Sequence, residues 1–100
     1  MLLDELQEEM REWEQERFPN RTQLHRGLVL SEETGEAAHH IIKRYDGPRI
    51  PEDNTAGLRD AVGDIGIILL IICEDEGWSF EEILKETWEQ VKHRRRYEHE

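Results

Sequence analysis

The fold of this chain depends on residues 58–76, which read LRDAVGDIGIILLIICEDE. Periodicity alone fits a buried strand there as well as a buried helix. We predict a helix, because no other segment offers a strand to pair with and because the pattern extends beyond the usual length of a strand. Apolar residues surround this helix almost completely, which predicts burial on all sides. Its uncharged core, residues 65–73, is far shorter than the about 20 residues of a membrane span.

Two helices are predicted to precede it, over residues 2–17 and 21–45. In the first, apolar residues recur every three or four positions, which indicates an amphipathic helix. Phe18 ends it, because a residue before proline is pushed out of the helical region. Asn20 is the expected N-cap of the second helix, and residues 46–57 are predicted to form a loop. The second helix carries an apolar arc: Leu24, Leu28, Leu30, Ala37, Ala38, Ile41 and Ile42.

A fourth helix is predicted over residues 79–97. Gly77 suits the C-cap of the preceding helix, and Ser79 with Glu82 matches a capping box that opens the next one. Together the four helices predict an all-α protein with a single domain over residues 1–100. One face of the fourth helix is apolar, and we expect its tryptophan in the core; this face carries Phe80, Leu84, Trp88 and Val91.

The charge balance narrows the classes of function. The chain has 100 residues, with 13 Lys and Arg against 24 Asp and Glu, and a formal net charge of −11. Nucleic-acid binders and proteins that coat anionic membranes need a positive field, so we expect neither partner. Cys73 is the only cysteine, which excludes an intramolecular disulfide and a cysteine-based zinc site. The N-terminus lacks the features of a signal peptide, and we expect a cytoplasmic protein.

Most acidic residues fit a solvated helix face, but two groups stand out. Glu33 and Glu36 lie about 60° apart on one strip of the second helix, away from its apolar arc. Asp60 and Asp64 lie one turn apart on the apolar third helix, where a buried unpaired carboxylate is very costly. An ion pair with another helix could offset that cost, and so could a metal. The residues assigned to solvated faces are Glu5, Glu8, Glu9, Glu12, Glu14 and Glu16 on the first helix, and Glu81, Glu82 and Glu86 on the fourth.

Two antiparallel helices that each carry two such carboxylates can bring four oxygen-bearing side chains to one point. Hard divalent cations such as Mg²⁺ prefer oxygen ligands in octahedral geometry and leave positions for water and substrate phosphates. The sequence therefore predicts a magnesium site with four candidate ligands, Glu33, Glu36, Asp60 and Asp64.

At these residues the chain resembles the all-α nucleoside triphosphate pyrophosphatase superfamily, the MazG-like group. The family signature is E-x-x-E followed by E-x-x-D, and residues 30–36, LSEETGE, resemble its first half. Asp64, followed by the apolar run, resembles the closing Asp of the second half. The chain departs from the pattern at Ala61, where the family usually has Glu, and Asp60 could serve as a displaced ligand. The resemblance covers residues 10–97.

This resemblance implies a four-helix MazG-like bundle that hydrolyses a nucleoside triphosphate to a monophosphate and pyrophosphate. Family members use Mg²⁺, for which Mn²⁺ can substitute, and their helices pair between subunits, which implies a homodimer or homotetramer. It further implies that Glu33 and Glu36 are catalytic, one of them positioning or deprotonating the attacking water. These two residues, with Asp60 and Asp64, would hold the metal.

Four residues are candidates for binding this substrate. Lys92 and Arg95 belong to the densest basic cluster of the chain, which could contact the triphosphate, as similar residues of the family do, or simply stabilise a helix C-terminus. Trp13 could stack on a base, although its apolar spacing also fits a core residue. His40 shares the carboxylate strip of the second helix and could lie near the substrate.

Two other classes of function remain open. Residues 36–39 match Glu-x-x-His, half of the ligand set of di-iron four-helix bundles, but the second half is absent from the sequence. A helical oligomer without catalysis, with a regulatory or protein-binding role, would explain the acidic residues as ion pairs and is consistent with Ala61. Mg²⁺ binding distinguishes the enzyme from this alternative.

Overall fold

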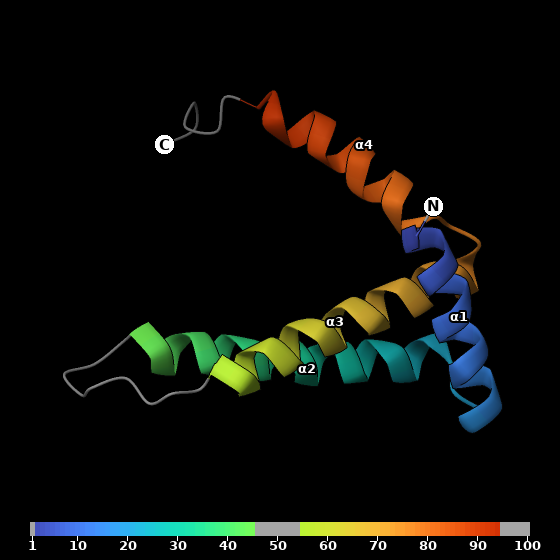
Figure 1. Cartoon of the computed structure of the whole chain (residues 1–100), viewed down its shortest axis with the longest axis horizontal. Helices are drawn as coiled ribbons and strands as arrows, with labels where there is room; N and C mark the ends of the chain where they lie inside the picture. The colour runs from blue at the N-terminus through green and yellow to red at the C-terminus, as the bar shows by residue number, and fades with distance from the viewer. Residues whose placement is uncertain (1, 46–54, 95–100) are drawn as a thin grey trace.

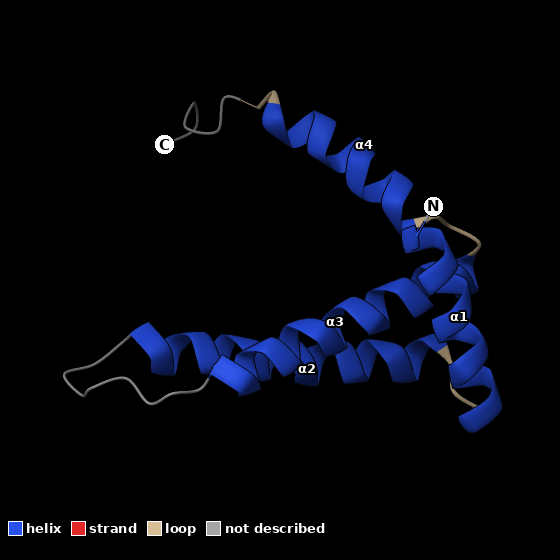
Figure 2. Ribbon diagram, viewed as in Figure 1, coloured by secondary structure: helices blue, strands red, loops and turns tan. Residues whose placement is uncertain are grey.

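The computed structural model describes residues 2–45 and 55–94, and within these ranges the chain consists of four α-helices and no strand (Figure 1, Figure 2). The all-α prediction is therefore confirmed. None of the described helices is long and apolar enough to cross a membrane. The helices are α1 (Leu2–Arg17), α2 (Gln23–Tyr45), α3 (Thr55–Glu76) and α4 (Phe80–Lys92).

The start of α2 differs from the prediction for a local reason. α1 ends at Arg17, directly before Phe18, as predicted. α2 begins two residues later than the predicted 21, because Thr22 caps it in place of Asn20. The Thr22 Oγ1 accepts a hydrogen bond from the His25 N–H at 3.4 Å, and such a bond satisfies one of the free N–H groups of a first helical turn.

The turn between α3 and α4 follows its predicted chemistry. Gly77 adopts a φ of +78°, and the Trp78 N–H donates to the Cys73 carbonyl at 2.9 Å. This is the bonding of a Schellman motif, in which glycine takes the left-handed conformation without a steric penalty. Ser79 is the N-cap of α4, and its Oγ accepts a hydrogen bond from the Glu82 N–H at 3.3 Å.

The other ends of these two helices differ from the predictions. α3 begins at Thr55 instead of residue 58. α4 ends at Lys92 with His93 as its C-cap. The prediction that the helix continues through residues 93 and 94 is therefore wrong, and residues 95–97 of the predicted helix lie outside the described ranges.

The four helices do not pack equally. α2 and α3 lie side by side, α1 crosses one end of this pair, and α4 touches α1 and α3 only near its own first turns (Figure 1). Beyond that point α4 runs away from α2 and α3, so one chain does not by itself complete a compact four-helix bundle.

A buried ion pair joins α1 to α2. Glu14 and Arg26 have 0% and 1% of their surface exposed. The Arg26 Nη2 donates to the Glu14 Oε1 at 2.6 Å, and the Arg26 Nε contacts both carboxylate oxygens. The assignment of Glu14 to a solvated face is therefore wrong. Two charges can be buried here because each neutralises the other through charge-assisted hydrogen bonds.

α3 joins this ion pair through Asp75. The Arg26 Nη1 lies 3.0 Å from the Asp75 Oδ2, and the Arg11 Nη2 lies 2.9 Å from the Asp75 Oδ1. Burial by itself raises the pKa of Asp75, but hydrogen bonds from Arg11 and Arg26 outweigh it and leave this pKa below its usual 3.8. Arg26 thus binds carboxylates from both neighbouring helices and ties α1, α2 and α3 together.

Two polar side chains of α1 hold the start of α4. Gln7 is 3% exposed; its Nε2 donates to the Trp78 carbonyl at 2.6 Å and its Oε1 accepts from the Phe80 N–H at 2.9 Å. The Ser79 Oγ donates to the Asp4 Oδ1 at 2.7 Å. The two bonds of Gln7 satisfy backbone groups that the turn leaves unpaired, and together with the Ser79–Asp4 bond they fix the direction in which α4 leaves the other helices.

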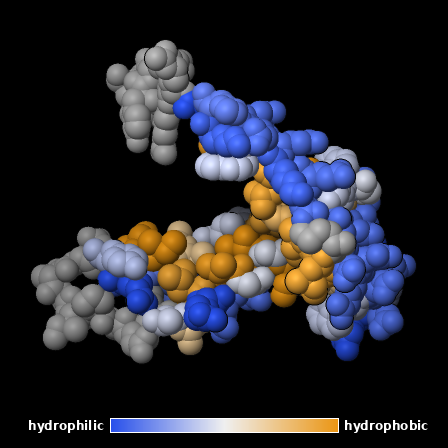
Figure 3. All heavy atoms as spheres, turned by 45° about the horizontal axis from the view of Figure 1, so that its top comes forward, coloured by the Kyte–Doolittle hydropathy of each residue, from blue (hydrophilic) through white to orange (hydrophobic). Residues whose placement is uncertain are grey.

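Several apolar side chains that were predicted in the core lie on the surface (Figure 3). α3 is not buried on all sides, because Val62 and Ile67 are 60% and 37% exposed. Trp88 on α4 is 58% exposed, against the prediction of a core residue. α2 turns Arg26 and Ala37 inward and leaves much of its predicted apolar arc exposed: Leu24, Leu28, Ile41 and Ile42.

The buried ion pair can be tested by removing one partner and then both. Arg26→Met is expected to lower the free energy of unfolding by about 3 kcal/mol, because it buries the Glu14 charge without its main partner. This loss of unfolding free energy is small for the removal of one partner from a buried ion pair, because Arg11 and Arg21 remain 3.7 and 3.8 Å from the Glu14 carboxylate and partly neutralise it. Urea unfolding followed by circular dichroism measures this change.

The matched control is the double variant Glu14→Leu/Arg26→Met, in which two apolar side chains replace the ion pair and neither position carries a charge. It should recover most of the stability that Arg26→Met loses. If the double variant were less stable than Arg26→Met, the cost would not arise from an uncompensated charge.

The lowered pKa of Asp75 predicts a dependence of stability on pH. The carboxylate stabilises the fold fully above its unfolded pKa of about 3.8 and loses this contribution as the pH falls through the lower folded pKa. The stability difference between the wild type and Asp75→Asn should therefore be largest near neutral pH and shrink on acidification. Urea unfolding across this pH range measures it, with Glu12→Gln as an exposed control; a difference that grew toward acid would contradict the assignment.

Candidate functional site

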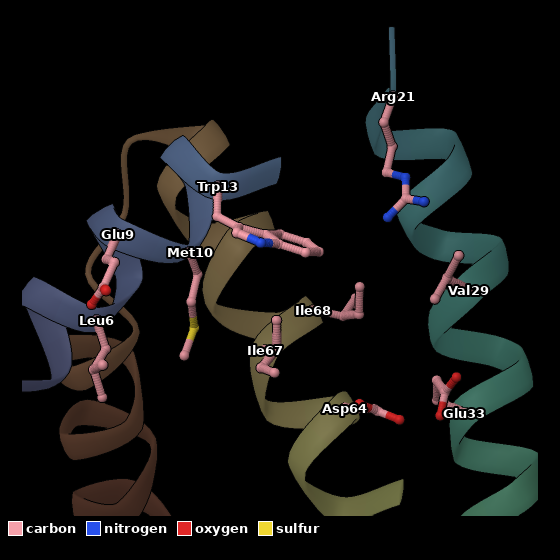
Figure 4. Close-up of a pocket in the computed structure, with 10 residues that line it drawn as sticks. All are labelled: Leu6, Glu9, Met10, Trp13, Arg21, Val29, Glu33, Asp64, Ile67 and Ile68. Atoms are coloured by element: carbon pink, nitrogen blue, oxygen red, sulfur yellow. The ribbon is translucent and has the colours of Figure 1, made fainter. Parts of the chain in front are cut away.

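A pocket of about 540 Å³ lies between α1, α2 and α3 (Figure 4). Its volume is in the range of small-molecule sites, and such sites combine apolar walls with a few polar groups, as this one does. The described residues that line it are Leu6, Glu9, Met10, Trp13, Arg21, Val29, Glu33, Asp64, Ile67 and Ile68.

Two of the predicted metal ligands meet in this pocket. Glu33 comes from α2 and Asp64 from α3, and in Figure 4 their side chains point toward each other across the gap between the two helices. The Glu33 Oε2 is buried and has no hydrogen-bond partner among the described residues. Because buried polar atoms are nearly always paired in folded proteins, this oxygen is a candidate to bind a ligand.

The pKa of Glu33 is raised above its usual 4.5. Burial makes the largest contribution, followed by the negative charges of Glu36 and Asp64. Each of these disfavours the ionised form. A bound cation would relieve the repulsion, and a raised pKa in a pocket is a physical marker of functional sites.

The two remaining predicted ligands are placed differently. Glu36 is exposed and does not line the pocket, although its charge acts on Glu33. Asp60 lies in a separate hollow at the start of α3, beside Arg59. Ala61, where the resembled family has Glu, is 3% exposed and belongs to the core. The structure thus brings two of the four predicted carboxylates into one pocket and leaves Glu36 and Asp60 outside it.

The predicted substrate-binding residues are also divided. His40 does not line the pocket but packs against the start of α3, where a Cβ built on Gly57 would lie 2.7 Å from the His40 Cε1. Lys92 lies at the far end of α4 and its Nζ is 2.7 Å from the Glu89 Oε1. Arg95 lies outside the described residues. Of these candidates only Trp13 lines the pocket.

Trp13 forms part of the pocket wall and is not a core residue, since it is 44% exposed. The Arg17 guanidinium lies 4.9 Å from the centre of its ring, and the Phe18 ring contacts it edge-on at 6.0 Å between centres. An aromatic ring held in place at a pocket is suited to stacking against a flat, apolar or aromatic ligand.

The sequence interpretation missed Arg21, the only basic side chain among the described residues that line the pocket. Its guanidinium lies 4.3 Å from the centre of the Phe18 ring and 3.8 Å from the Glu14 carboxylate. Nothing in the sequence distinguishes Arg21 from the other arginines of this acidic chain. Its position depends on the turn between α1 and α2, in which the Arg21 N–H donates to the Phe18 carbonyl at 3.0 Å.

The donor set fits a magnesium ion that keeps part of its water shell. In residues 2–45 and 55–94 no three His, Cys, Asp or Glu side chains come together closely enough to form a metal cage. Glu33 and Asp64 nevertheless offer two carboxylates and one unpaired buried oxygen. Mg²⁺ is commonly held by one or two carboxylates with water and substrate phosphates, so these two residues are the ones that would hold it.

Comparisons with models of protein families, with curated proteins and with solved structures find no significant match to this chain. The resemblance to the MazG-like group therefore stands on the E-x-x-E stretch and on Asp64 alone.

The proximity of Asp64 to Glu33 predicts a pKa change that requires no knowledge of function. Asp64→Asn should lower the pKa of Glu33, because it removes a neighbouring negative charge. Asp60→Asn, one turn away on the same helix, is the matched control and should change this pKa much less. A pH titration of the Glu33 side-chain carboxyl carbon by NMR measures both, and equal effects would contradict the arrangement.

Proposed function

We propose that the protein is a Mg²⁺-dependent nucleoside triphosphate pyrophosphohydrolase that releases a nucleoside monophosphate and pyrophosphate in the cytoplasm. The observation that supports it most is the meeting of Glu33 and Asp64 in one pocket, with a buried Glu33 oxygen that lacks a partner among the described residues. Both carboxylates are among the three that the MazG-like motif singles out, with Glu36 as the third, although the motif itself contains no information on how α2 and α3 pack.

Glu33 and Asp64 are the residues that would hold the metal. When bound, Mg²⁺ neutralises phosphate charge and lowers the pKa of a coordinated water. In this proposal Glu33 also orients or deprotonates the attacking water, and Glu36 contributes negative charge at the pocket from the next turn of α2. Mn²⁺ should substitute for Mg²⁺, since it prefers similar oxygen ligands.

Other pocket residues suit the rest of a nucleotide. Trp13, with the apolar side chains of Met10 and Ile67, offers a wall for the base. Arg21 offers a guanidinium for a phosphate group. Lys92 is remote from this pocket within one chain (Figure 1), so its predicted contact with phosphate would require another subunit. This is consistent with a homodimer or homotetramer, as the resemblance implies.

A helical oligomer without catalysis remains the second candidate. The buried core position of Ala61 and the placement of Asp60 outside the pocket favour it, because both reduce the number of carboxylates available to a metal. Measuring Mg²⁺ binding separates the candidates: a hydrolase must bind the ion in about the millimolar range or better, whereas an ion-pair network need not.

Asp64→Asn and Glu33→Gln are expected to reduce kcat/KM by about 100-fold or more, because each removes a metal-binding carboxylate from the pocket. Asp60→Asn is the matched control and should retain most of the activity. Assays of a panel of nucleoside triphosphates with Mg²⁺ should release pyrophosphate and not orthophosphate. Activity at wild-type rates in Asp64→Asn, or orthophosphate as the only product, would refute the proposal.

A further inference from the structure

α4 has an apolar stripe that no other described part of the chain covers. Leu84, Trp88 and Val91 are 53%, 58% and 40% exposed. With Phe80 they are spaced four, four and three residues apart, which places all four on one side of the helix. No residue of α4 is buried. A contiguous apolar stripe on an otherwise charged helix marks an interaction surface.

This stripe is held in a defined position. Gln7 and Asp4 of α1 bond to the backbone and side chains of the turn that begins α4, and Figure 3 shows an open hollow between α4 and the α2–α3 pair. A partner would therefore meet a surface whose orientation is already set, which lowers the entropic cost of association.

The spacing of the stripe suits a second copy of the same helix. Its four residues are arranged almost symmetrically about residue 86, with Leu84 and Trp88 close to the centre and Phe80 and Val91 near the ends. A two-fold axis at this point would place Leu84 against Trp88 and Phe80 against Val91 of the other copy. Such an isologous contact covers the stripe of both chains at once.

The charges of α4 favour the antiparallel orientation. The first turn is acidic, with Glu81 and Glu82, whereas Lys92 and Arg94 lie at the other end. Glu81 and Lys92 flank the stripe on the same side, at 100° per residue, and such flanks face each other across an antiparallel pair. Each basic end then lies beside the acidic end of the other copy, and the helix dipoles are opposed. A parallel pair would place like charges together.

We propose that α4 is the dimerisation helix of this protein and that it pairs antiparallel with α4 of a second copy, with Leu84 and Trp88 at the centre of the contact. This rests on the homo-oligomer included in the proposed function and names its surface, but it does not depend on hydrolytic activity.

Sedimentation equilibrium tests the surface. Leu84→Glu should raise the dimer dissociation constant by about 100-fold, since it buries a charge at the centre of the contact. Glu is a good helix former and Leu84 is exposed, so the helix content measured by circular dichroism should not change. Leu28→Glu on α2, at a leucine that is 59% exposed, is the matched control and should leave the dimer intact.

Two results of this experiment would overturn the proposal. One is a wild-type chain that remains monomeric at about 100 μM, a concentration at which a specific dimer should form. The other is a dimer that Leu28→Glu dissociates and Leu84→Glu does not, which would place the interface on α2. Neither result depends on substrate turnover, so a failure of this proposal and a failure of the hydrolase proposal are distinguishable.

Spin-label distances test the orientation. In a Cys73→Ala background, labels at Glu82→Cys, Glu86→Cys and Gln90→Cys lie away from the stripe. An antiparallel pair predicts the shortest label-to-label distance at residue 86, and an axial separation of about 12 Å at residues 82 and 90, from 1.5 Å per residue. Equal distances at all three positions would show a parallel pair and refute the proposal.

Discussion

The ion pair between Glu14 and Arg26 is the contact on which the arrangement of the other helices depends. Buried charges are stable only where their partners meet them, so the position of Arg26 determines which side of α2 faces α1 and α3. Glu33 lies seven residues after Arg26, two helical turns along the same face. The contact that buries Arg26 therefore also turns Glu33 toward Asp64 and forms the acidic part of the pocket.

The same rotation of α2 explains the unusual surface of the chain. With a polar strip turned inward, much of the apolar arc of α2 faces outward, and α4 adds a second apolar surface because Gln7 and Asp4 direct it away from the other helices. A single copy thus buries its ion pairs and exposes much of its apolar area. The association with a second copy that we propose through α4 would remove part of this apolar area from water, which stabilises the associated state.

The sequence predicted part of the candidate site. Glu33 was singled out by its place on a carboxylate strip away from the apolar arc of its helix. Asp64 was singled out because a carboxylate on an apolar helix was expected to be buried at a cost, although the structure leaves Asp64 exposed. Asp60 met the same criterion but lies in another hollow. Helical spacing determines the direction of a residue around its own helix, but it does not determine which neighbouring helix lies in that direction. Arg21 had no sequence signal, since its contribution arises from the turn between α1 and α2. Trp13 fitted both a core residue and a residue that stacks on a base, and the structure excludes the core by placing it at the pocket wall.

Three features could be predicted from the local chemistry of the sequence: the presence of four α-helices, the caps formed by Gly77 and Ser79, and the break at Phe18. These features depend on interactions within a few residues, which the sequence displays directly. The burial of Glu14, the outward apolar arc of α2 and the direction of α4 were decided by the tertiary structure alone. Each depends on a partner that is distant in sequence: Arg26 for Glu14, Asp75 for Arg26, and Gln7 for the turn before α4. An amphipathic pattern shows that a helix has two sides, but which side is buried is determined by the groups that it meets.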